Sequence, residues 1–451
     1  MNIWKNIDEK TYDEIFAYGE DYKNFLNVAK TEREAVIYFE KEARARGFKS
    51  LEEFEGALKK GDKIFLNNKN KSCILLVLGE NLEDGLNIVG SHIDSPRLDI
   101  KARPLYEDLD LCYLKTHYYG GVKKYQWPTI ELALHGFFID KRGEKRNISI
   151  GEDEKDPVFF INDLLPHLAK DQMQKTADKL IEAENLNIVI GHSSFKAKDG
   201  ENPLKENILK ILKDKYSLEE DDFMVAEFEA VPAAKARDVG FDRALIAGHG
   251  QDDRICSYAN FRAVLECENP KRSACALLVD KEEIGSVGNT AMTARYFEIF
   301  LGEILEKMGK YSDLKLKKAL ANSKVLSADV AAGYDPDYKE VFDKNNAPLL
   351  GSGIVMVKYT GSRGKSGSND ANAEFLYEIK NLFERENIFF QTGEIGKTDQ
   401  GGGGTIAYIL AEHGAEVVDM GPAVLSMHAP LELSSKADAY MTYKAYKAFT
   451  K

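Results

Sequence analysis

Two adjacent glutamates, Glu282 and Glu283, follow a strongly apolar stretch over 274–279. This stretch is long enough for one buried strand, and a helical pattern begins at Thr290. A strand, an acidic turn and a helix are how an open α/β sheet presents reactive side chains at the carboxyl end of a strand. One glutamate could bind a metal ion while the other handles the proton of its water. An isolated pair of this kind is more often a solvated loop, so the rest of the chain has to decide between the two interpretations.

Metal-capable side chains sit just past the carboxyl ends of five predicted strands. These strands are predicted over 86–89, 244–247, 274–279, 324–326 and 424–427. The side chains are His92, Asp252 or Asp253, the Glu282–Glu283 pair, Asp329 and His428. In a doubly wound sheet such strand ends share one edge, so residues hundreds of positions apart can converge. A lone His or Asp after a strand is usually a cap or loop residue, but five at equivalent positions favour a functional site.

The types of these side chains suit zinc, which binds imidazole nitrogen and carboxylate oxygen. Two histidines and three carboxylates are too many for one tetrahedral ion and right for two, provided that one carboxylate bridges. Two such ions can polarise a carbonyl and lower the pKa of a shared water towards ~7. One further glutamate is then left as the general base.

Asp94 lies two residues after His92, where its carboxylate could accept the other ring N–H of that imidazole and fix its tautomer. A turn residue before Ser95 and Pro96 is an equally good interpretation of the same aspartate.

The elements that must position these residues fall into two predicted regions. Residues 1–100 and 241–451 alternate strand and helix patterns, which is typical of a doubly wound α/β sheet with helices on both faces. Residues 101–240 are rich in aromatic and β-branched segments and hold few candidate catalytic groups. We therefore expect a mixed-sheet α/β catalytic domain with a β-rich domain inserted into it. Within the insert, 164–185 has a helical pattern.

The first fifty residues predict two helices, over 8–30 and 31–46. Thr31 is a candidate N-cap for the second helix, and Glu34 is placed to complete a capping box. Gly47 follows as a stop signal.

Composition restricts the partners and the compartment. The 451 residues include 74 acidic and 61 basic side chains, a formal net charge of −13, so we expect no nucleic-acid partner. The five cysteines are an odd number without a C-x-x-C pair, which favours a reducing cytoplasm. The N-terminus lacks the apolar core of a signal peptide, and no run approaches the ~18 apolar residues of a membrane span. We therefore expect a cytoplasmic protein with no membrane partner.

Five motifs resemble, in their order along the chain, those of the aspartyl aminopeptidase and aminopeptidase I family of di-zinc exopeptidases. They are GSHIDSPRLDIK at 90–101, GQDDR at 250–254, DKEEIGS at 280–286, SADVA at 327–331 and SMHAPLE at 426–432. The resemblance covers nearly the full length of the chain. It implies two zinc ions per subunit, with cobalt or manganese as substitutes, held by His92, Asp252, Glu283, Asp329 and His428.

Within this resemblance, Asp252 would bridge the two ions, and Asp253 is the alternative. Glu282 matches the family's general base, which takes a proton from the bridging water and passes it to the leaving amine. Asp94 would support catalysis beside His92.

The resemblance also implies that the inserted domain pairs subunits, and that the dimers assemble into a tetrahedral dodecamer. His167 lies where relatives place a histidine that reaches a neighbouring active site, but the spacing departs and the equivalent position falls on Asp171. Gly402 and Gly403 lie in a glycine run that lacks the phosphate-loop pattern and matches a loop along the substrate backbone.

Arg363 and Lys365 lie in a Gly/Ser-rich loop and could supply the cation for an acidic first residue of the substrate. A basic loop is more often simply solvated.

The sequence thus predicts a zinc aminopeptidase acting on short peptides with a free N-terminus, with acidic first residues as a candidate preference. Another di-zinc amide hydrolase, carboxypeptidase-like or deacylase-like, is one alternative. A self-assembling shell protein without catalysis is the other.

Overall fold

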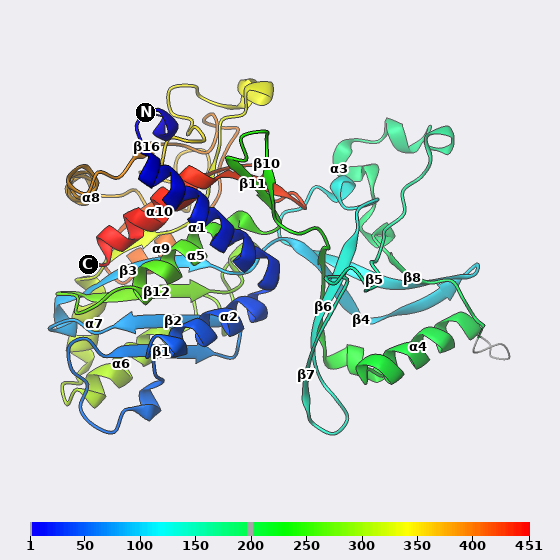
Figure 1. Ribbon diagram of the computed structural model, residues 1–451, viewed down its shortest axis with the longest axis horizontal. Coiled ribbons are helices and arrows are strands. Elements are labelled where there is room, and N and C mark those ends of the chain that lie inside the picture. The colour runs from blue at the N-terminus through cyan, green and yellow to red at the C-terminus, as the bar shows by residue number, and fades with distance from the viewer. Residues whose placement is uncertain (1, 196–201) are drawn as a thin grey trace. The chain divides into compact units, whose positions relative to one another are not determined.

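A computed structural model describes residues 2–195 and 202–451 of the chain (Figure 1). Contacts between residues divide the chain into two units. Unit 1 comprises Met1–Ser95, Ala236–Met427 and Glu432–Lys451, and unit 2 comprises Pro96–Lys235 and His428–Leu431. The predicted insert over 101–240 contains 196–201, which lie outside the described residues. The domain boundaries inferred from the sequence stay a prediction.

The main sheet of unit 1 has eight strands and is mixed. In spatial order they are β1 (Lys63–Asn68), β2 (Ser72–Val77), β12 (Ser273–Val279), β3 (Leu86–His92), β13 (Lys324–Ser327), β17 (Glu416–Gly421), β15 (Ile354–Val357) and β16 (Phe390–Thr392). The central strands β12, β3, β13 and β17 are parallel neighbours. β1 pairs with β2, β2 with β12, and β15 with β17 in the antiparallel direction.

Helices cover both faces of this sheet, because alternate strand residues point to opposite sides. Cys73 and Leu75 of β2 belong to one apolar cluster, and Ile74 and Leu76 belong to another. The first cluster includes α1 (Glu9–Val28), α2 (Glu32–Ala45), α5 (Gln251–Leu265), α8 (Ala373–Arg385) and α10 (Lys436–Phe449). The second includes α6 (Tyr296–Lys307), α7 (Asp313–Ala321) and α9 (Ala407–Ala411). The predicted α/β class is confirmed. Within the described ranges, no helix is both long and apolar enough to cross a membrane.

The start of α2 has the predicted capping box. The Thr31 hydroxyl accepts the Glu34 backbone N–H at 3.3 Å, and Glu34 Oε2 accepts the Thr31 N–H at 3.1 Å. Both bonds satisfy donors that a helix end leaves unpaired, so this local signal predicted the boundary of the helix.

A second, five-stranded sheet in unit 1 was not predicted. Its spatial order is β10 (Arg237–Val239), β11 (Leu245–Gly248), β19 (Glu432–Ser435), β18 (Ala423–Leu425) and β14 (Ala331–Ala332). β19 pairs on one side with β11 and on the other with β18, so it joins strands that are far apart in the sequence.

Unit 2 is built on a six-stranded antiparallel sheet. Its order is β7 (Lys145–Ile150), β6 (Leu132–Ile139), β9 (Glu227–Pro232), β4 (Arg97–Asp108), β5 (Leu111–Tyr119) and β8 (Ile188–Gly191). The helix α4 (Pro203–Tyr216) packs Leu204 and Leu212 into the same apolar cluster as this sheet.

The helix predicted over 164–185 is wrong. The segment holds three short 3₁₀ helices, Pro166–Leu168, Gln172–Gln174 and Ala183–Asn185, and the four-residue α-helix α3 (Ala177–Leu180). Leu164, Leu165 and Leu168 are between 46% and 67% exposed. A long helix whose leucines stay this exposed gains little from packing to offset the cost of helix nucleation.

Asp238 in β10 ties the terminal helices to the second sheet. Its carboxylate pairs with Lys23 Nζ of α1 at 2.5 Å and with Lys436 Nζ of α10 at 2.8 Å. Lys436 is completely buried, and the Asp238 side chain is 8% exposed. Burial raises the pKa of Asp238, but hydrogen bonds from Lys23, Lys436 and Arg243 outweigh it and hold that pKa well below its ordinary value.

We expect Asp238→Ala to lower the free energy of unfolding by about 3 kcal/mol, because Lys436 is left buried without its partner. Urea unfolding at pH 7 measures this change. Glu384→Ala, which breaks the exposed Lys380–Glu384 pair, is the control and should cost less than about 1 kcal/mol. The Asp238 contribution is present above the ordinary aspartate pKa of about 4 and declines as the pH falls below it. A difference between wild type and Asp238→Ala that did not shrink in acid would contradict this account.

Candidate metal centre

Three neighbouring parallel strands bring site residues to one edge of the main sheet. β3 ends at His92, whose register partner is Val279 at the end of β12. Asp329 follows two residues after the end of β13. The predicted convergence is therefore confirmed for His92 at the end of β3 and for the side chains that follow β12 and β13.

The side chains form two overlapping groups that could each hold a cation. Within each group, the candidate ligand atoms all lie within 4.8 Å of one another. One group is His92, Asp252 and Glu283, and the other is His92, Asp253 and Asp329. Both aspartates of the GQDDR motif thus face the site, and the geometry does not select one of them as the bridge.

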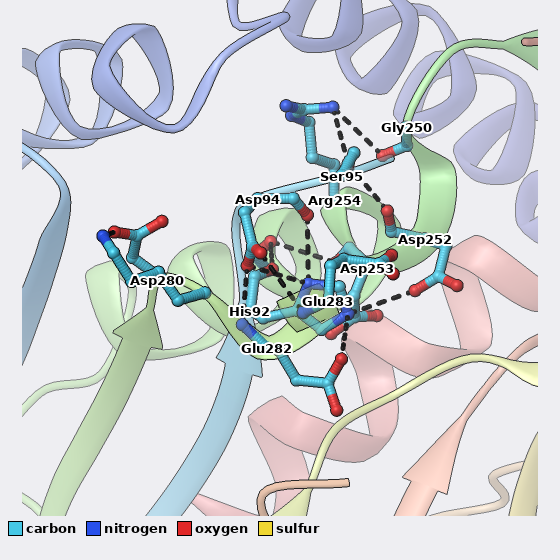
Figure 2. Close-up of polar contacts among 12 residues, drawn as sticks. His92, Asp94, Ser95, Gly250, Asp252, Asp253, Arg254, Asp280, Glu282 and Glu283 are labelled. Carbon is cyan, nitrogen blue, oxygen red and sulfur yellow. Dashed lines mark hydrogen bonds and ion pairs between the residues drawn. The ribbon is translucent and has the colours of Figure 1, made fainter. Parts of the chain in front are cut away.

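The His92 ring is oriented between two aspartates, as Figure 2 shows. Its Nε2 lies 3.1 Å from Asp252 Oδ1. Its Nδ1 lies 3.0 Å from the Asp94 carbonyl oxygen and 3.4 Å from Asp94 Oδ1. Burial lowers the pKa of His92, but its contacts with Asp252 and Asp94 outweigh burial and raise it well above the ordinary value.

Burial dominates the electrostatics of the other acids. It raises the pKa of Asp253 and of Asp329 well above the ordinary aspartate value. Asp253 is completely buried, and among the described residues neither of its carboxylate oxygens has a hydrogen-bond partner. Such a group is costly to bury as an anion unless a cation neutralises it.

Asp94 has a second contact that the sequence analysis missed. Its Oδ1 accepts the backbone N–H of Glu282, and its Oδ2 accepts that of Glu283, both at 3.2 Å. One buried carboxylate therefore fixes the backbone of both glutamates as well as lying beside His92.

The two glutamates occupy different environments. Glu283 belongs to the first ligand group, whereas Glu282 belongs to neither of the groups found in the described part of the chain. Glu282 Oε2 lies 3.9 Å from His92 Nε2, and its side chain is 16% exposed. Glu282 therefore lies close to the candidate ligands without being one of them, so its carboxylate is available for a role other than metal binding.

The assumption that all five strand ends share one edge is wrong for two of them. The strands before Asp252 and His428 are β11 and β18, which belong to the second sheet. The strand propensity of a segment does not say which sheet it joins. Here β19 pairs with both β11 and β18, and β11 is distant from β19 in the sequence.

Asp252 reaches the site through the first turn of α5 instead. Asp252 and Asp253 have non-helical dihedral angles there, and the peptide bond between them is cis. The Glu432 carboxylate accepts the Asp252 N–H at 3.0 Å, and the Ser95 hydroxyl donates to the Asp252 carbonyl at 2.8 Å. Arg254 Nη1 donates to Ser95 Oγ at 3.0 Å (Figure 2).

Ser95, Arg254 and Glu432 are supporting residues that the sequence analysis did not assign. Each lies inside one of the quoted motifs, within four residues of a predicted ligand. Their closeness to the predicted ligands in the sequence is the signal that could have identified them.

His428 is not in either ligand group of the described residues. It belongs to unit 2 by its contacts, and its Nδ1 lies 2.8 Å from the Gly121 carbonyl oxygen. Its role as a ligand stays a prediction. His167 and Asp171 are exposed in the turn-rich part of unit 2, and their roles also stay predictions.

The predicted substrate loops of unit 1 meet around one cavity of about 250 Å³. Arg363, Lys365 and Gly401 line it. The Gly403 carbonyl accepts the Gly361 N–H at 2.7 Å, which joins the glycine run containing Gly402 to the basic loop. Lys365 pairs with Asp370 at 3.0 Å.

The family model of the aminopeptidase I zinc metalloproteases (M18) matches residues 25–450. The chain belongs to this family. A probable M18 family aminopeptidase 1 of Clostridium acetobutylicum is 52% identical over 454 residues, covering 99% of this chain and 97% of the relative. One of Thermotoga maritima is 44% identical over 448 residues, covering 99% and 98%.

The solved structures that match the whole chain include two bacterial aminopeptidases. The Thermotoga maritima aminopeptidase has a TM-score of 0.96 at 43% identity, with 100% of this chain and 99% of that chain covered. Aminopeptidase I of Clostridium acetobutylicum has a TM-score of 0.94 at 48% identity, with the same coverage. M18 membership confirms the predicted zinc aminopeptidase function and the mixed α/β fold.

The residues fit the metal of the M18 family. Zinc takes imidazole nitrogen and carboxylate oxygen, which are the donors of both ligand groups. The buried Asp253 carboxyl is the kind of group that a cation would satisfy.

We expect Asp329→Asn to weaken zinc binding by more than about tenfold, because an amide is a poorer ligand than a carboxylate. Zinc content after gel filtration, measured by mass spectrometry, checks this. Asp419→Asn is the matched control, since Asp419 is also buried and lies on the neighbouring strand β17. If Asp329→Asn kept the zinc content of the wild type, Asp329 would not be a zinc ligand.

Proposed function

We propose that this M18 enzyme uses two zinc ions to hydrolyse the first peptide bond of short peptides with a free N-terminus. The observation that supports two ions is the pair of ligand groups that share His92. Together the groups offer five donor residues, more than one tetrahedral ion accepts.

The proposed ligands are those that the motifs imply. They are His92, Asp252, Glu283, Asp329 and His428. Asp252 is the proposed bridge and Asp253 the alternative. Cobalt or manganese would be accepted by the same donors, because both bind imidazole and carboxylate.

When bound, zinc polarises the scissile carbonyl and makes the attacking water more acidic. The protein's part in this chemistry is proton transfer and positioning. We assign Glu282 as the general base, whose carboxylate takes the proton from water and then donates it to the leaving amine nitrogen. Asp94 supports this step because it holds the backbone N–H of Glu282.

We further propose that the cavity around Arg363 and Lys365 receives the side chain of the first substrate residue. Arg363 has no ion-pair partner in the described part of the chain, so its charge is available to an acidic side chain. Gly402 and Gly403 would lie along the substrate backbone. Equal rates on aspartyl, glutamyl, leucyl and lysyl substrates would contradict the acidic preference.

We propose a cytoplasmic homo-oligomer in which dimers, paired through the 101–240 insert, form a dodecamer. All five cysteines are free and buried, which suits a reducing compartment. Leu165, Leu168 and Met173 are exposed on unit 2, as expected of an interface. His167 or Asp171 would then reach a neighbouring active site. A monomer in light scattering would contradict the assembly.

We expect Glu282→Gln to retain zinc and to lower kcat by at least ~100-fold, because glutamine cannot accept the proton. Glu283→Ala should instead lose zinc. Zinc content and kcat measured on the same preparations separate the two roles. Glu268→Gln, an exposed glutamate outside the site, is the control. Full activity in Glu282→Gln would refute the mechanism.

N-acetylation of the substrate distinguishes this function from a deacylase that uses the same site. We expect free aminoacyl peptides to be cleaved and their N-acetylated forms to resist cleavage, because an exopeptidase of this type needs the free amine. Product analysis by mass spectrometry checks this. Release of acetate from the blocked peptides would favour the deacylase.

A further inference from the structure

Lys281 forms the turn between the end of β12 and the two glutamates of the site. Its backbone is left-handed, with φ 67° and ψ 21°. Residues with a side chain adopt this conformation at an energetic cost, whereas glycine adopts it freely. Because Glu282 follows directly, the conformation of Lys281 sets the position and direction of the Glu282 side chain.

The Lys281 ammonium is held by two buried side chains. It donates to Asp280 Oδ2 at 2.5 Å and to Thr290 Oγ1 at 2.8 Å. The Thr290 hydroxyl donates to the same Asp280 oxygen at 2.6 Å. Asp280 and Thr290 are each 1% exposed, so these charge-assisted bonds are largely shielded from water. We call these three residues the turn triangle.

Gly288, which has no side chain, leaves room for the Lys281 side chain. A Cβ at Gly288 would lie 2.9 Å from Lys281 Cδ, closer than normal contact allows. Gly288 has a φ of 138°, which also favours glycine. The lysine stem therefore passes this glycine, and its ammonium reaches Asp280. Asp280 is labelled in Figure 2.

The other side of the turn is fixed by backbone hydrogen bonds. The Lys281 carbonyl accepts the Ser286 N–H at 2.7 Å, and Asp94 accepts the N–H groups of Glu282 and Glu283. The strand side of the turn is thus held by the turn triangle together with the backbone bond from the Asp280 N–H to the Thr290 carbonyl at 3.4 Å, and Asp94 holds the site side.

We propose that Lys281 is a positioning residue that works through Glu282. Its ammonium, held by Asp280 and Thr290, stabilises the left-handed turn and so keeps the Glu282 carboxylate next to His92. This inference rests on the proposed role of Glu282 as the general base. Opening the turn moves the base relative to the reacting atoms without removing a metal ligand.

Two substitutions at Lys281 separate the ammonium from the backbone conformation. We expect Lys281→Ala to lower kcat about ten- to a hundredfold with little change in KM, because a displacement near 1 Å is enough for such a loss. Lys281→Gly should retain at least about fivefold more kcat than Lys281→Ala, since glycine adopts the turn without the ammonium. Thr290→Val should lose kcat, and Thr290→Ser, which keeps the hydroxyl, should restore most of it.

Zinc content and the thermal midpoint of every variant are measured alongside, and exposed Lys310→Ala is the control. Support requires wild-type zinc in Lys281→Ala together with the loss of kcat and the advantage of glycine over alanine. Lys281→Ala within twofold of wild-type kcat, while Glu282→Gln is inactive, overturns this inference alone. Zinc loss in Lys281→Ala, or no advantage of glycine, overturns it as well. Full activity in Glu282→Gln overturns the proposed function itself.

Discussion

Burying several acidic side chains around the imidazole of His92 is the constraint on which the rest of the site depends. Burial raises the pKa of Asp253 and Asp329, because a buried carboxylate loses its hydration. The M18 family binds zinc, and a bound cation would resolve this conflict, because its positive charge offsets the hydration that the buried carboxylates lose. A cluster of acids that is unfavourable alone thereby becomes a binding site.

The protein holds these acids in place mainly through their backbone. Asp94 binds the N–H groups of Glu282 and Glu283, and Glu432 binds the N–H of Asp252. Because these two carboxylates bind backbone N–H groups, they position the backbone of Glu282, Glu283 and Asp252. The side chains of those three residues are left to face the site. Rigid strands and such supporting contacts keep the ligand atoms close enough for a metal ion.

Local signals predicted the elements that local interactions stabilise. The capping box of Thr31 and Glu34 set the start of α2, because both bonds form within one helical turn. The pattern over 164–185 predicted one long helix that does not form, since Leu164, Leu165 and Leu168 are largely exposed and their burial cannot compensate the cost of helix nucleation.

The sequence by itself determined which residue types are available for the site and that three of them follow parallel strands. Ligand chemistry depends on side-chain type, and the order of strand and helix patterns depends on local hydrophobicity, so both are visible in one dimension. Only the tertiary structure decided that β11 and β18 join a second sheet, that both Asp252 and Asp253 face His92, and that Asp94 and the Lys281 side chain form hydrogen bonds at the acidic turn. These outcomes depend on pairing between distant segments, whose free energy comes from packing and hydrogen bonds that no local pattern records.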